Sequence, residues 1–332
     1  MTTLVAQIAP QRSTQYAALA SALAPQELRL SPLSAEIISL DAITLGGQAF
    51  LRLELRREPT ETELAELGAL AMTSAFFRYF ERLGEREGPF LQPLDTHWAP
   101  AMPADLPEVR RYKGKTNELL TRFLCHAARY SSAFAQRPWG SLRVLDPLAG
   151  GGTTVFTALV LGAAAAGIDS SARVMESTAS FLREYVREEG IAAQIKEERL
   201  RQVGRRWWFT LGKEKRLRCL LATGEVGDAP TLLAGFGQPH LIVGDLPYGI
   251  QHTGELEALL QEALPMWAGL LEPGGAVALA WDATRFGRER MLALVGACDA
   301  LTALNDAPYD ALAHRVDRVI KRRDILVARR TN

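Results

Sequence analysis

From residue 142 onward, short apolar runs alternate with longer stretches in which apolar residues recur every three or four positions. Five of the apolar runs have the length and composition of buried strands: "LRVLD", "AAAAGID", "RLRCLLATG", "HLIVGD" and "GAVALAWD". Amphipathic segments lie between them, of which "SSARVMESTASFLREYVREEG" begins with capping serines and ends at Gly190. This alternation predicts an α/β domain with an open, mostly parallel sheet and helices on both faces.

The N-terminal part of the chain has a different pattern. "STQYAALASAL" and "ETELAELGALAMTSAFF" have helical periodicity, whereas "AEIISL" and "QAFLRLEL" alternate or run apolar like strands. We therefore expect a smaller α+β domain over residues 1–88. Prolines recur through residues 89–107 and disfavour regular structure, so this range is predicted to be a linker. Residues 108–332 are then the larger domain.

Composition narrows the class of protein. The 48% of hydrophobic residues are enough for a large core, and 38 basic residues balance 38 acidic ones. This balance argues against broad, charge-driven coating of DNA, although it permits a local basic face. The sequence has no apolar stretch that could span a bilayer, no signal-peptide pattern at its start, and three widely spaced cysteines without metal-ligand spacing. We expect a cytoplasmic protein that uses neither a metal nor a membrane.

The stretch "VLDPLAGGGTT" carries the first candidate chemistry. Glycines between a strand and a helix allow a close backbone approach to a ligand, and N–H groups at the helix start favour an anionic group. Close packing of the helix on the strand would demand the same glycines. The preceding Asp146 would repel a pyrophosphate but suits the ammonium and sulfonium charges of S-adenosylmethionine. The candidate cofactor contacts in this loop are Asp146, Pro147, Ala149, Gly150, Gly151, Gly152, Thr153 and Thr154.

Acidic residues follow the next two predicted strands. Asp169 ends the second strand, where a carboxylate can accept hydrogen bonds from ribose hydroxyls, and Ser170 lies beside it. Glu225 follows the third strand, where it could bind the adenine amine, and Asp228 is the competing candidate. Ligands of open α/β sheets bind beyond the carboxyl ends of the strands, so we expect these residues at one cofactor site.

The stretch "GDLPYGIQH" follows the apolar run "HLIV". A turn alone could explain its proline and glycine. The alternative is that it holds a flat ring: the Asp245 carboxylate and the carbonyl of Leu246 or Pro247 accept the hydrogens of a base amine, while Tyr248 stacks on the base. These four residues are the candidate catalytic group. The candidate substrate contacts beside them are Gly249 and His252.

A basic and aromatic stretch, "QIKEERLRQVGRRWWFTLGKEKRLR", precedes the third strand of the cofactor site. Cations neutralise phosphates and aromatic rings stack on bases, so Arg205, Arg206 and Trp207 are candidate RNA contacts. The alternative is a half-buried strand whose charged residues only face solvent.

Two motifs resemble a known family. "DPLAGGGTT" resembles the first motif of class I S-adenosylmethionine-dependent methyltransferases, and "DLPYG" resembles their amino-methylating signature, in which Asp, Asn or Ser precedes Pro-Pro and Tyr or Phe. The closest subgroup is the RNA methyltransferases that modify the guanine 2-amino group of tRNA. The resemblance covers about residues 112–330 and implies a Rossmann-like, doubly wound, mostly parallel sheet of seven strands. Leu246 replaces the family's first proline, which implies a looser turn.

The resemblance also implies further contacts and a substrate class. Related enzymes contact the cofactor through the segment matching "YKGKTNELLTRFL", which makes Lys115, Thr116 and Asn117 candidates. The expected function is methyl transfer to an exocyclic base amine of RNA, with guanine N2 in tRNA first and residues 1–88 as a possible RNA-binding domain. The alternatives are a DNA adenine-N6 methyltransferase, a protein or small-molecule methyltransferase, and a non-catalytic cofactor-binding module.

Overall fold

The computed structural model describes residues 1–10, 18–112, 114–214, 216–247, 253–316 and 321–331. The chain divides into two compact units. The first comprises Met1–Ala99 and Asp306–Arg323, and the second comprises Pro100–Asn305 and Asp324–Asn332. The division therefore falls inside the range expected to be a linker. It also assigns a late segment of the chain to the first unit, which the local sequence pattern gave no reason to expect.

The first unit contains one sheet and two α-helices among its described residues. Its elements are β1 (Thr2–Ile8), α1 (Leu19–Leu30), β2 (Ile37–Leu45), β3 (Gln48–Leu55), α2 (Glu61–Gly68), β4 (Thr73–Leu83) and β5 (Arg86–Pro93). The strand order is β2-β3-β1-β4-β5, and neighbouring strands are antiparallel. The first four strands and two helices follow the βαββαβ order of ferredoxin-like units, to which β5 is added at the edge.

Two predicted elements of this unit are wrong in their extent. The helix expected over "ETELAELGALAMTSAFF" ends at Gly68, and β4 begins at Thr73. A side chain at Gly68 would clash, because a Cβ there would lie 1.8 Å from the Thr96 carbonyl oxygen. Strand β5 includes Pro89 and Pro93, which the sequence assigned to the linker. An edge strand tolerates proline because one row of its N–H groups needs no partner strand.

The core of the first unit lies between its sheet and its helices. Leu4 on β1, Leu23 on α1 and Leu53 on β3 are fully buried. Glu27 on α1 is also buried, and its carboxylate accepts the backbone N–H groups of Ala71 at 2.9 Å and Met72 at 2.7 Å. These bonds satisfy the buried carboxylate and fix α1 to the chain that enters β4.

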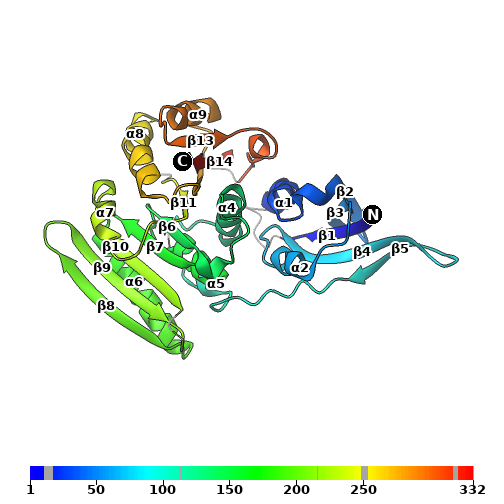
Figure 1. Cartoon of the computed structure of the whole chain (residues 1–332), viewed down its shortest axis with the longest axis horizontal. Coiled ribbons are helices and arrows are strands. Elements are labelled where there is room, and N and C mark those ends of the chain that lie inside the picture. The colour runs from blue at the N-terminus through cyan, green and yellow to red at the C-terminus, as the bar shows by residue number, and fades with distance from the viewer. Residues whose placement is uncertain (11–17, 113, 215, 248–252, 317–320, 332) are drawn as a thin grey trace. The chain divides into compact units, whose positions relative to one another are not determined.

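The second unit is built on a sheet that has nine strands in the described part of the chain. They are β6 (Arg143–Asp146), β7 (Ala164–Asp169), β8 (Ala193–Leu200), β9 (Gly204–Leu211), β10 (Leu217–Thr223), β11 (Leu241–Asp245), β12 (Ala276–Asp282), β13 (Leu301–Leu304) and β14 (Arg323–Arg330). Their order is β13-β14-β12-β11-β6-β7-β10-β9-β8 (Figure 1). The five strands from β12 to β10 are parallel neighbours, so their carboxyl ends share one edge.

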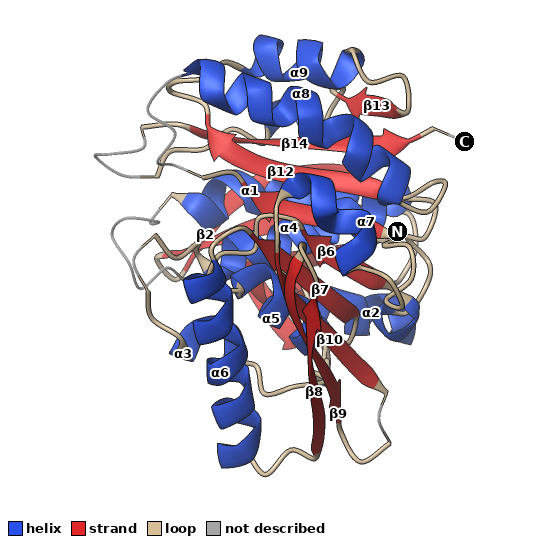
Figure 2. Cartoon of the chain, turned by 90° about the vertical axis from the view of Figure 1, so that its left-hand side faces the viewer, coloured by secondary structure: helices blue, strands red, loops and turns tan. Residues whose placement is uncertain are grey.

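Helices cover both faces of this sheet. They are α3 (Leu106–Val109), α4 (Glu118–Ser131), α5 (Thr153–Leu161), α6 (Ala172–Glu188), α7 (Ala229–Leu232), α8 (Thr253–Leu270) and α9 (Arg288–Gly296). Helix α5 packs on the face that carries Gly167, whereas Ala166 and Ile168 face the core cluster that includes α7, α8 and α9 (Figure 2). The predicted doubly wound α/β arrangement is thus present.

The expected count of seven strands is corrected by a hairpin. Strands β8 and β9 pair antiparallel with each other, and β9 pairs antiparallel with β10 at the end of the sheet. They contain most of the basic and aromatic stretch noted in the sequence. Charged residues fill positions 196–199 of β8 and occupy Arg205 and Arg206 on β9, so the stretch lacks the continuous apolar run that marks the central strands.

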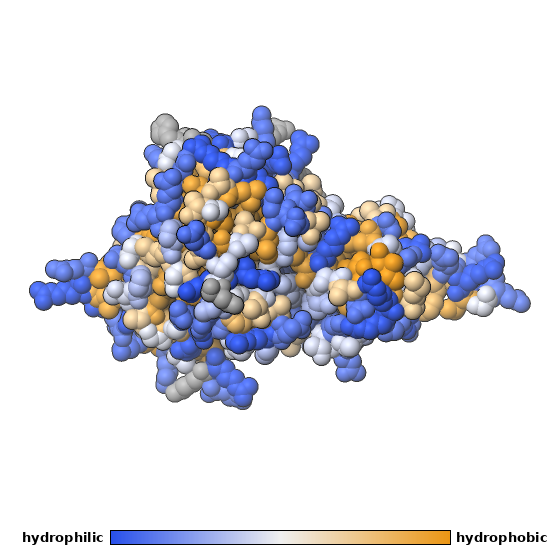
Figure 3. Space-filling view, turned by 45° about the horizontal axis from the view of Figure 1, so that its top comes forward, coloured by the Kyte–Doolittle hydropathy of each residue, from blue (hydrophilic) through white to orange (hydrophobic). Residues whose placement is uncertain are grey.

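The surface of the molecule is mostly polar on the face drawn in Figure 3, where hydrophilic side chains surround smaller hydrophobic patches. Within the described residues, no helix is long and apolar enough to cross a membrane.

Candidate active site

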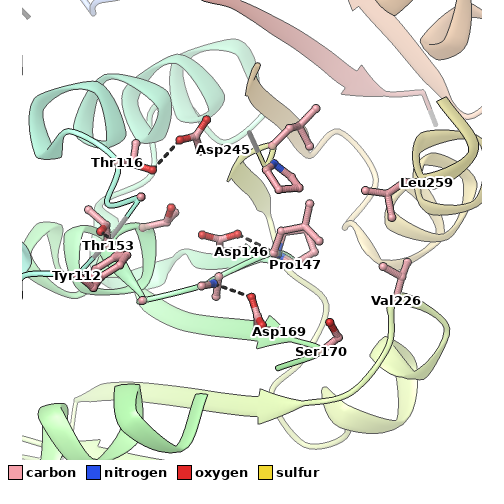
Figure 4. A pocket seen from close by; sticks show the side chains of 18 of the residues that line it. Tyr112, Thr116, Asp146, Pro147, Thr153, Asp169, Ser170, Val226, Asp245 and Leu259 are labelled. Atoms are coloured by element: carbon pink, nitrogen blue, oxygen red, sulfur yellow. Dashed lines mark hydrogen bonds between the residues drawn. The ribbon is translucent and has the colours of Figure 1, made fainter. Parts of the chain in front are cut away.

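A cavity of about 640 Å³ opens at the carboxyl ends of β6, β7, β10 and β11 (Figure 4). Most of the predicted cofactor and catalytic residues line it. These are Thr116, Asp146, Pro147, Ala149, Gly150, Gly151, Thr153, Thr154, Asp169, Ser170, Glu225, Asp245, Leu246 and Pro247. The lining also includes residues that the sequence did not single out: Tyr112, Gly114, Leu148, Gly224, Val226 and Leu259. The cavity is therefore assembled from strand ends together with the chain before α4 and one residue of α8.

Three predicted cofactor contacts have structural roles beside the cavity instead. Gly152 is the N-cap of α5 and has a φ of +86°, a left-handed conformation that favours glycine. Asn117 is the N-cap of α4, and its Oδ1 accepts the backbone N–H of Leu120 at 3.1 Å. Lys115 donates to the Glu108 carbonyl oxygen at 2.9 Å and forms an ion pair with the carboxylate of α4's first residue.

Asp146, at the end of β6, is a buried carboxyl group in the wall of the cavity. It is 4% exposed, and its Oδ1 accepts the backbone N–H of Leu148 at 3.0 Å. Burial raises the pKa of Asp146 to about 7, and the nearby carboxylates of Asp245 and Asp169 act in the same direction, whereas the Thr154 hydroxyl opposes them. A positively charged group in the cavity would reverse this effect by stabilising the ionised form.

The glycine loop is held in place by the chain before α4. The ring of Tyr112 packs on Gly151, where a Cβ would lie 2.1 Å from a ring carbon. The Tyr112 hydroxyl lies 2.6 Å from Oγ1 of Thr153, and an Arg110 N–H donates to the Gly151 carbonyl oxygen at 2.9 Å. Sequence reasoning selected this segment but missed Tyr112, although an aromatic residue next to the selected "KGKT" was the available signal.

The first turn of α5 begins at this loop. Its N-cap residue is a glycine, and no side chain caps the helix. The first-turn N–H groups of a helix have no partner within the helix, so they can bind an anionic group of a ligand. Thr153 and Thr154, the first two residues of the helix, line the cavity. The end of the cavity at α5 therefore suits a carboxylate.

Asp169, at the end of β7, orders the loop and still has acceptor capacity. Its Oδ2 accepts the Gly150 N–H at 2.9 Å (Figure 4). Its Oδ1 accepts the Ser171 N–H at 2.8 Å. An ionised carboxylate offers about four acceptor positions, so these two bonds leave room for hydroxyl donors from a ligand.

The structure separates the two candidates that follow β10. Glu225 lines the cavity. Asp228 does not, and its Oδ2 accepts the backbone N–H of Glu225 at 3.1 Å in the turn Val226–Asp228. The Glu225 side chain in turn accepts the backbone N–H of Asp228, so Glu225 both lines the cavity and helps to fix this turn.

The Asp-Leu-Pro corner lies across the cavity from Asp169. Thr116 Oγ1 donates to Asp245 Oδ2 at 2.6 Å (Figure 4). Leu246 is 1% exposed, belongs to the core cluster that includes α8, and donates its N–H to the Ala280 carbonyl oxygen on β12 at 2.8 Å. The backbone bond and the buried side chain thus anchor Leu246 at the position of the family's first proline. The looser turn expected from this leucine stays a prediction, because the turn continues outside the described residues. Tyr248, Gly249 and His252 lie outside the described residues.

The predicted RNA contacts on β9 are not among the lining residues of this cavity. Arg205 pairs with Glu176 at 3.3 Å and with Glu197 at 3.4 Å. Arg206 pairs with Glu198 at 2.6 Å and also donates to two backbone carbonyl groups. Trp207 is 3% exposed and so offers no free face for stacking. The half-buried strand, which the sequence left as the alternative, describes these three residues.

The cavity has a strongly one-sided charge. Asp146, Asp169, Glu225 and Asp245 line it, and no Lys, Arg or His is among its described lining residues. Such a lining favours a cationic ligand and disfavours a polyphosphate. Among the described residues, no group of three or more His, Cys, Asp or Glu side chains is arranged to hold a metal ion.

Comparison with protein families and with curated proteins finds no match. Among solved structures, TrmN from Thermus thermophilus is 16% identical with a TM-score of 0.48, covering 99% of this chain and 100% of TrmN. The 16S rRNA N2 methyltransferase RsmC of T. thermophilus, solved with AdoMet and guanosine, is 16% identical with a TM-score of 0.36, covering 89% of this chain and 59% of its own.

A third similar structure is the magnesium protoporphyrin IX methyltransferase ChlM from Synechocystis PCC 6803 with bound SAM. It is 13% identical with a TM-score of 0.40, and the match covers 66% of this chain and 87% of ChlM. These likenesses are remote, so the chemistry of the cavity has to be inferred from its own residues.

Proposed function

We propose that this chain is an S-adenosylmethionine-dependent methyltransferase that acts on an exocyclic base amine of RNA. The observation that carries the proposal is the acidic cavity at the strand ends, in which the glycine loop and the Asp-Leu-Pro corner face one space. Its volume of about 640 Å³ lies within the range of roughly 300–1,000 Å³ that is common for small-ligand and cofactor sites.

The polar groups that line the cavity match each part of an S-adenosylmethionine molecule. The buried Asp146 carboxyl, with its pKa raised to about 7, matches the positively charged methionine portion. The uncapped start of α5 matches the carboxylate. Asp169 and Glu225 supply acceptors for ribose hydroxyls and the adenine amine. When bound, the cofactor supplies an electrophilic methyl group.

Asp245 is the proposed catalytic group. An exocyclic base amine is a poor nucleophile because its lone pair is delocalised into the ring. The Asp245 carboxylate and the backbone carbonyl of Leu246 or Pro247 would accept the amine hydrogens, which localises the lone pair on nitrogen. Thr116 orients the carboxylate through its 2.6 Å hydrogen bond, and the anchored Leu246 fixes the direction of the corner. Catalysis would then depend on positioning and preorganised hydrogen bonds.

Guanine N2 in tRNA is the first candidate substrate. It is supported by the "DLPYG" sequence, which resembles the signature of enzymes that methylate this amine. The decisive experiment is incubation of the full chain with labelled methyl donor and separate pools of tRNA, rRNA and DNA. Digestion to nucleosides then identifies the modified base, and label in N2-methylguanosine from tRNA is the expected result.

The variant Asp245→Ala tests the catalytic assignment. We expect methyl transfer to fall by about 10²–10³-fold, since removal of one preorganised hydrogen-bonding group costs this much in comparable sites. Binding of S-adenosylhomocysteine, followed as a rise in melting temperature, should remain. The matched control is Asp282→Ala, which removes the carboxylate at the end of neighbouring β12, outside the cavity lining. Label in none of the nucleic acids would contradict the proposed function.

A further inference from the structure

We propose that the β8–β9 turn is a binding site for the phosphate backbone of the RNA substrate, with Arg199 and Arg201 as its contacts. This inference rests on the proposed function and names the part of the surface that receives the substrate beyond the reacting base. Within the basic stretch, Arg199 and Arg201 thus take the place of Arg206 and Trp207 as the proposed RNA contacts. Arg206 is paired with Glu198, and Trp207 is buried.

The turn forms one wall of a second hollow, of about 560 Å³. Its described lining residues are Ala172, Glu176, Arg199, Leu200, Arg201, Gln202, Val203, Gly204, Arg205, Trp207 and Thr223. Three arginines and one glutamate are the charged residues in this set. The hollow is therefore positive, in contrast to the acidic cavity, and suits a polyanion.

The arginines of the hollow differ in how they are neutralised. Arg205 is held by Glu176 and Glu197. Arg199 and Arg201 are exposed, and neither side chain forms an ion pair or hydrogen bond with another described residue. Arg199 lies directly opposite the neutralised Arg205 in the strand register. An anion bound at Arg199 and Arg201 would supply the counter-charge that these two side chains do not receive from other described residues.

The hollow adjoins the acidic cavity at two points along the chain. Thr223 lines the hollow, while Gly224 and Glu225 line the cavity. Ser170 lines the cavity, while Ala172 lines the hollow. Consecutive Cα atoms are about 3.8 Å apart, so the two spaces are neighbours at the same edge of the sheet. A strand of RNA bound with a base at Asp245 can therefore continue across this edge to the turn.

The strand order sets the distance that the RNA must cover. Four to five strand spacings separate Asp245 on β11 from Arg205 on β9 and Arg199 on β8. At about 4.8 Å per spacing, this is roughly 20–25 Å. Stacked nucleotides advance about 3.4 Å each, so the arginines would meet phosphates about six or seven nucleotides from the methylated base.

The test compares two double variants of the full chain in binding to the tRNA pool at several salt concentrations. Arg199→Ala with Arg201→Ala should weaken binding roughly 10- to 30-fold near 0.1 M salt. It should also reduce the slope of log affinity against log salt by about 1–2, because each phosphate contact contributes about 0.7–0.9. Lys213→Ala with Arg216→Ala removes two exposed cations at the other end of β9 and should change neither quantity.

Methyl transfer provides the second readout. For the arginine variant, KM for RNA should rise while kcat and the S-adenosylhomocysteine-induced rise in melting temperature stay at wild-type values. The inference would be overturned if both double variants lost the same amount of RNA affinity, or if the arginine variant bound RNA as tightly as the wild-type chain. Neither result would affect the proposed function as long as the wild-type chain methylates RNA. Failure of the wild-type chain to methylate RNA would instead overturn the proposed function.

Discussion

The acidic cavity and the β8–β9 hairpin are both rich in charged residues, but their charges are arranged differently. In the cavity, four carboxyl groups come together without a basic side chain among the described lining residues. Along the hairpin, Arg205 and Arg206 each meet a glutamate, and only the turn keeps exposed arginines without such partners. Like charges that gather on one surface repel each other, so a one-sided lining favours a ligand of opposite sign. Paired charges point to a structural role.

The overall charge of the chain carries little functional information, because charges of opposite sign gather in different places. The 38 basic and 38 acidic residues cancel in number. The cavity nevertheless concentrates one sign, and the turn at the same sheet edge concentrates the other. A cationic cofactor portion and a polyanionic substrate could then bind side by side without competing for the same groups.

The largest expected effect comes from Asp146→Asn, which removes one negative charge from the cavity and keeps an oxygen to accept the Leu148 N–H. Its measurement is the free energy of unfolding between pH 4 and pH 8. The pKa of Asp146 is raised from 3.8 to about 7, so the folded state binds this proton more tightly than the unfolded state. Wild-type stability therefore falls as pH rises from about 4 to 7, by up to about 4 kcal/mol.

Asparagine does not ionise, so the free energy of unfolding of Asp146→Asn should not fall in this way. The amount by which it exceeds the wild-type value should be small at pH 4 and should reach its maximum by pH 8. The same variant should lose the rise in melting temperature caused by S-adenosylhomocysteine, because the ammonium group loses its charged partner. Asp282→Asn is the control, since this carboxyl group lies outside the cavity lining. The prediction is contradicted if the free energies of unfolding of wild type and Asp146→Asn change in parallel with pH over this range, because ionisation of the buried Asp146 would then not destabilise the folded state.

A second prediction concerns the Asp-Leu-Pro corner of the cavity. Leu246→Pro restores the Pro-Pro of the amino-methylating signature, yet it removes a buried side chain and the N–H bond to the Ala280 carbonyl oxygen. We expect the free energy of unfolding to fall by about 3 kcal/mol, measured by denaturant titration. Leu246→Met, which nearly conserves volume, should cost less than about 1.5 kcal/mol. A proline variant as stable as wild type would mean that the leucine does not anchor the corner.

The sequence predicted those parts of the site that depend on local pattern. Asp146, Asp169 and Asp245 each end an apolar run, and the ends of parallel strands meet at one edge, so their convergence followed from the strand assignment. The glycine loop could also be predicted from local sequence, because a tight turn between a strand and a helix limits which residues fit there.

Contacts between distant segments could not be predicted in this way. Tyr112 packs on Gly151, and Leu246 bonds to Ala280, through neighbours that only the folded sheet provides. The pairing of Arg206 with Glu198 likewise depends on the register of a hairpin whose first strand, with four consecutive charged residues, resembles a solvated surface stretch. Whether an arginine is neutralised or available therefore depends on tertiary structure rather than on composition.

The smallest predicted effect separates the two kinds of arginine in the hairpin. Arg206 is 13% exposed and bonds to Glu198 and to the carbonyl oxygens of Leu232 and Ala234. Its replacement by alanine leaves these acceptors without their donor, which should lower the melting temperature by about 2–4 °C. Arg199→Ala, at an exposed position without side-chain partners, should shift it by less than about 1 °C. Differential scanning calorimetry measures both values in the absence of RNA. If Arg199→Ala proves as destabilising as Arg206→Ala, the turn is held together by its arginines, and the contrast between paired and available charge within the hairpin disappears.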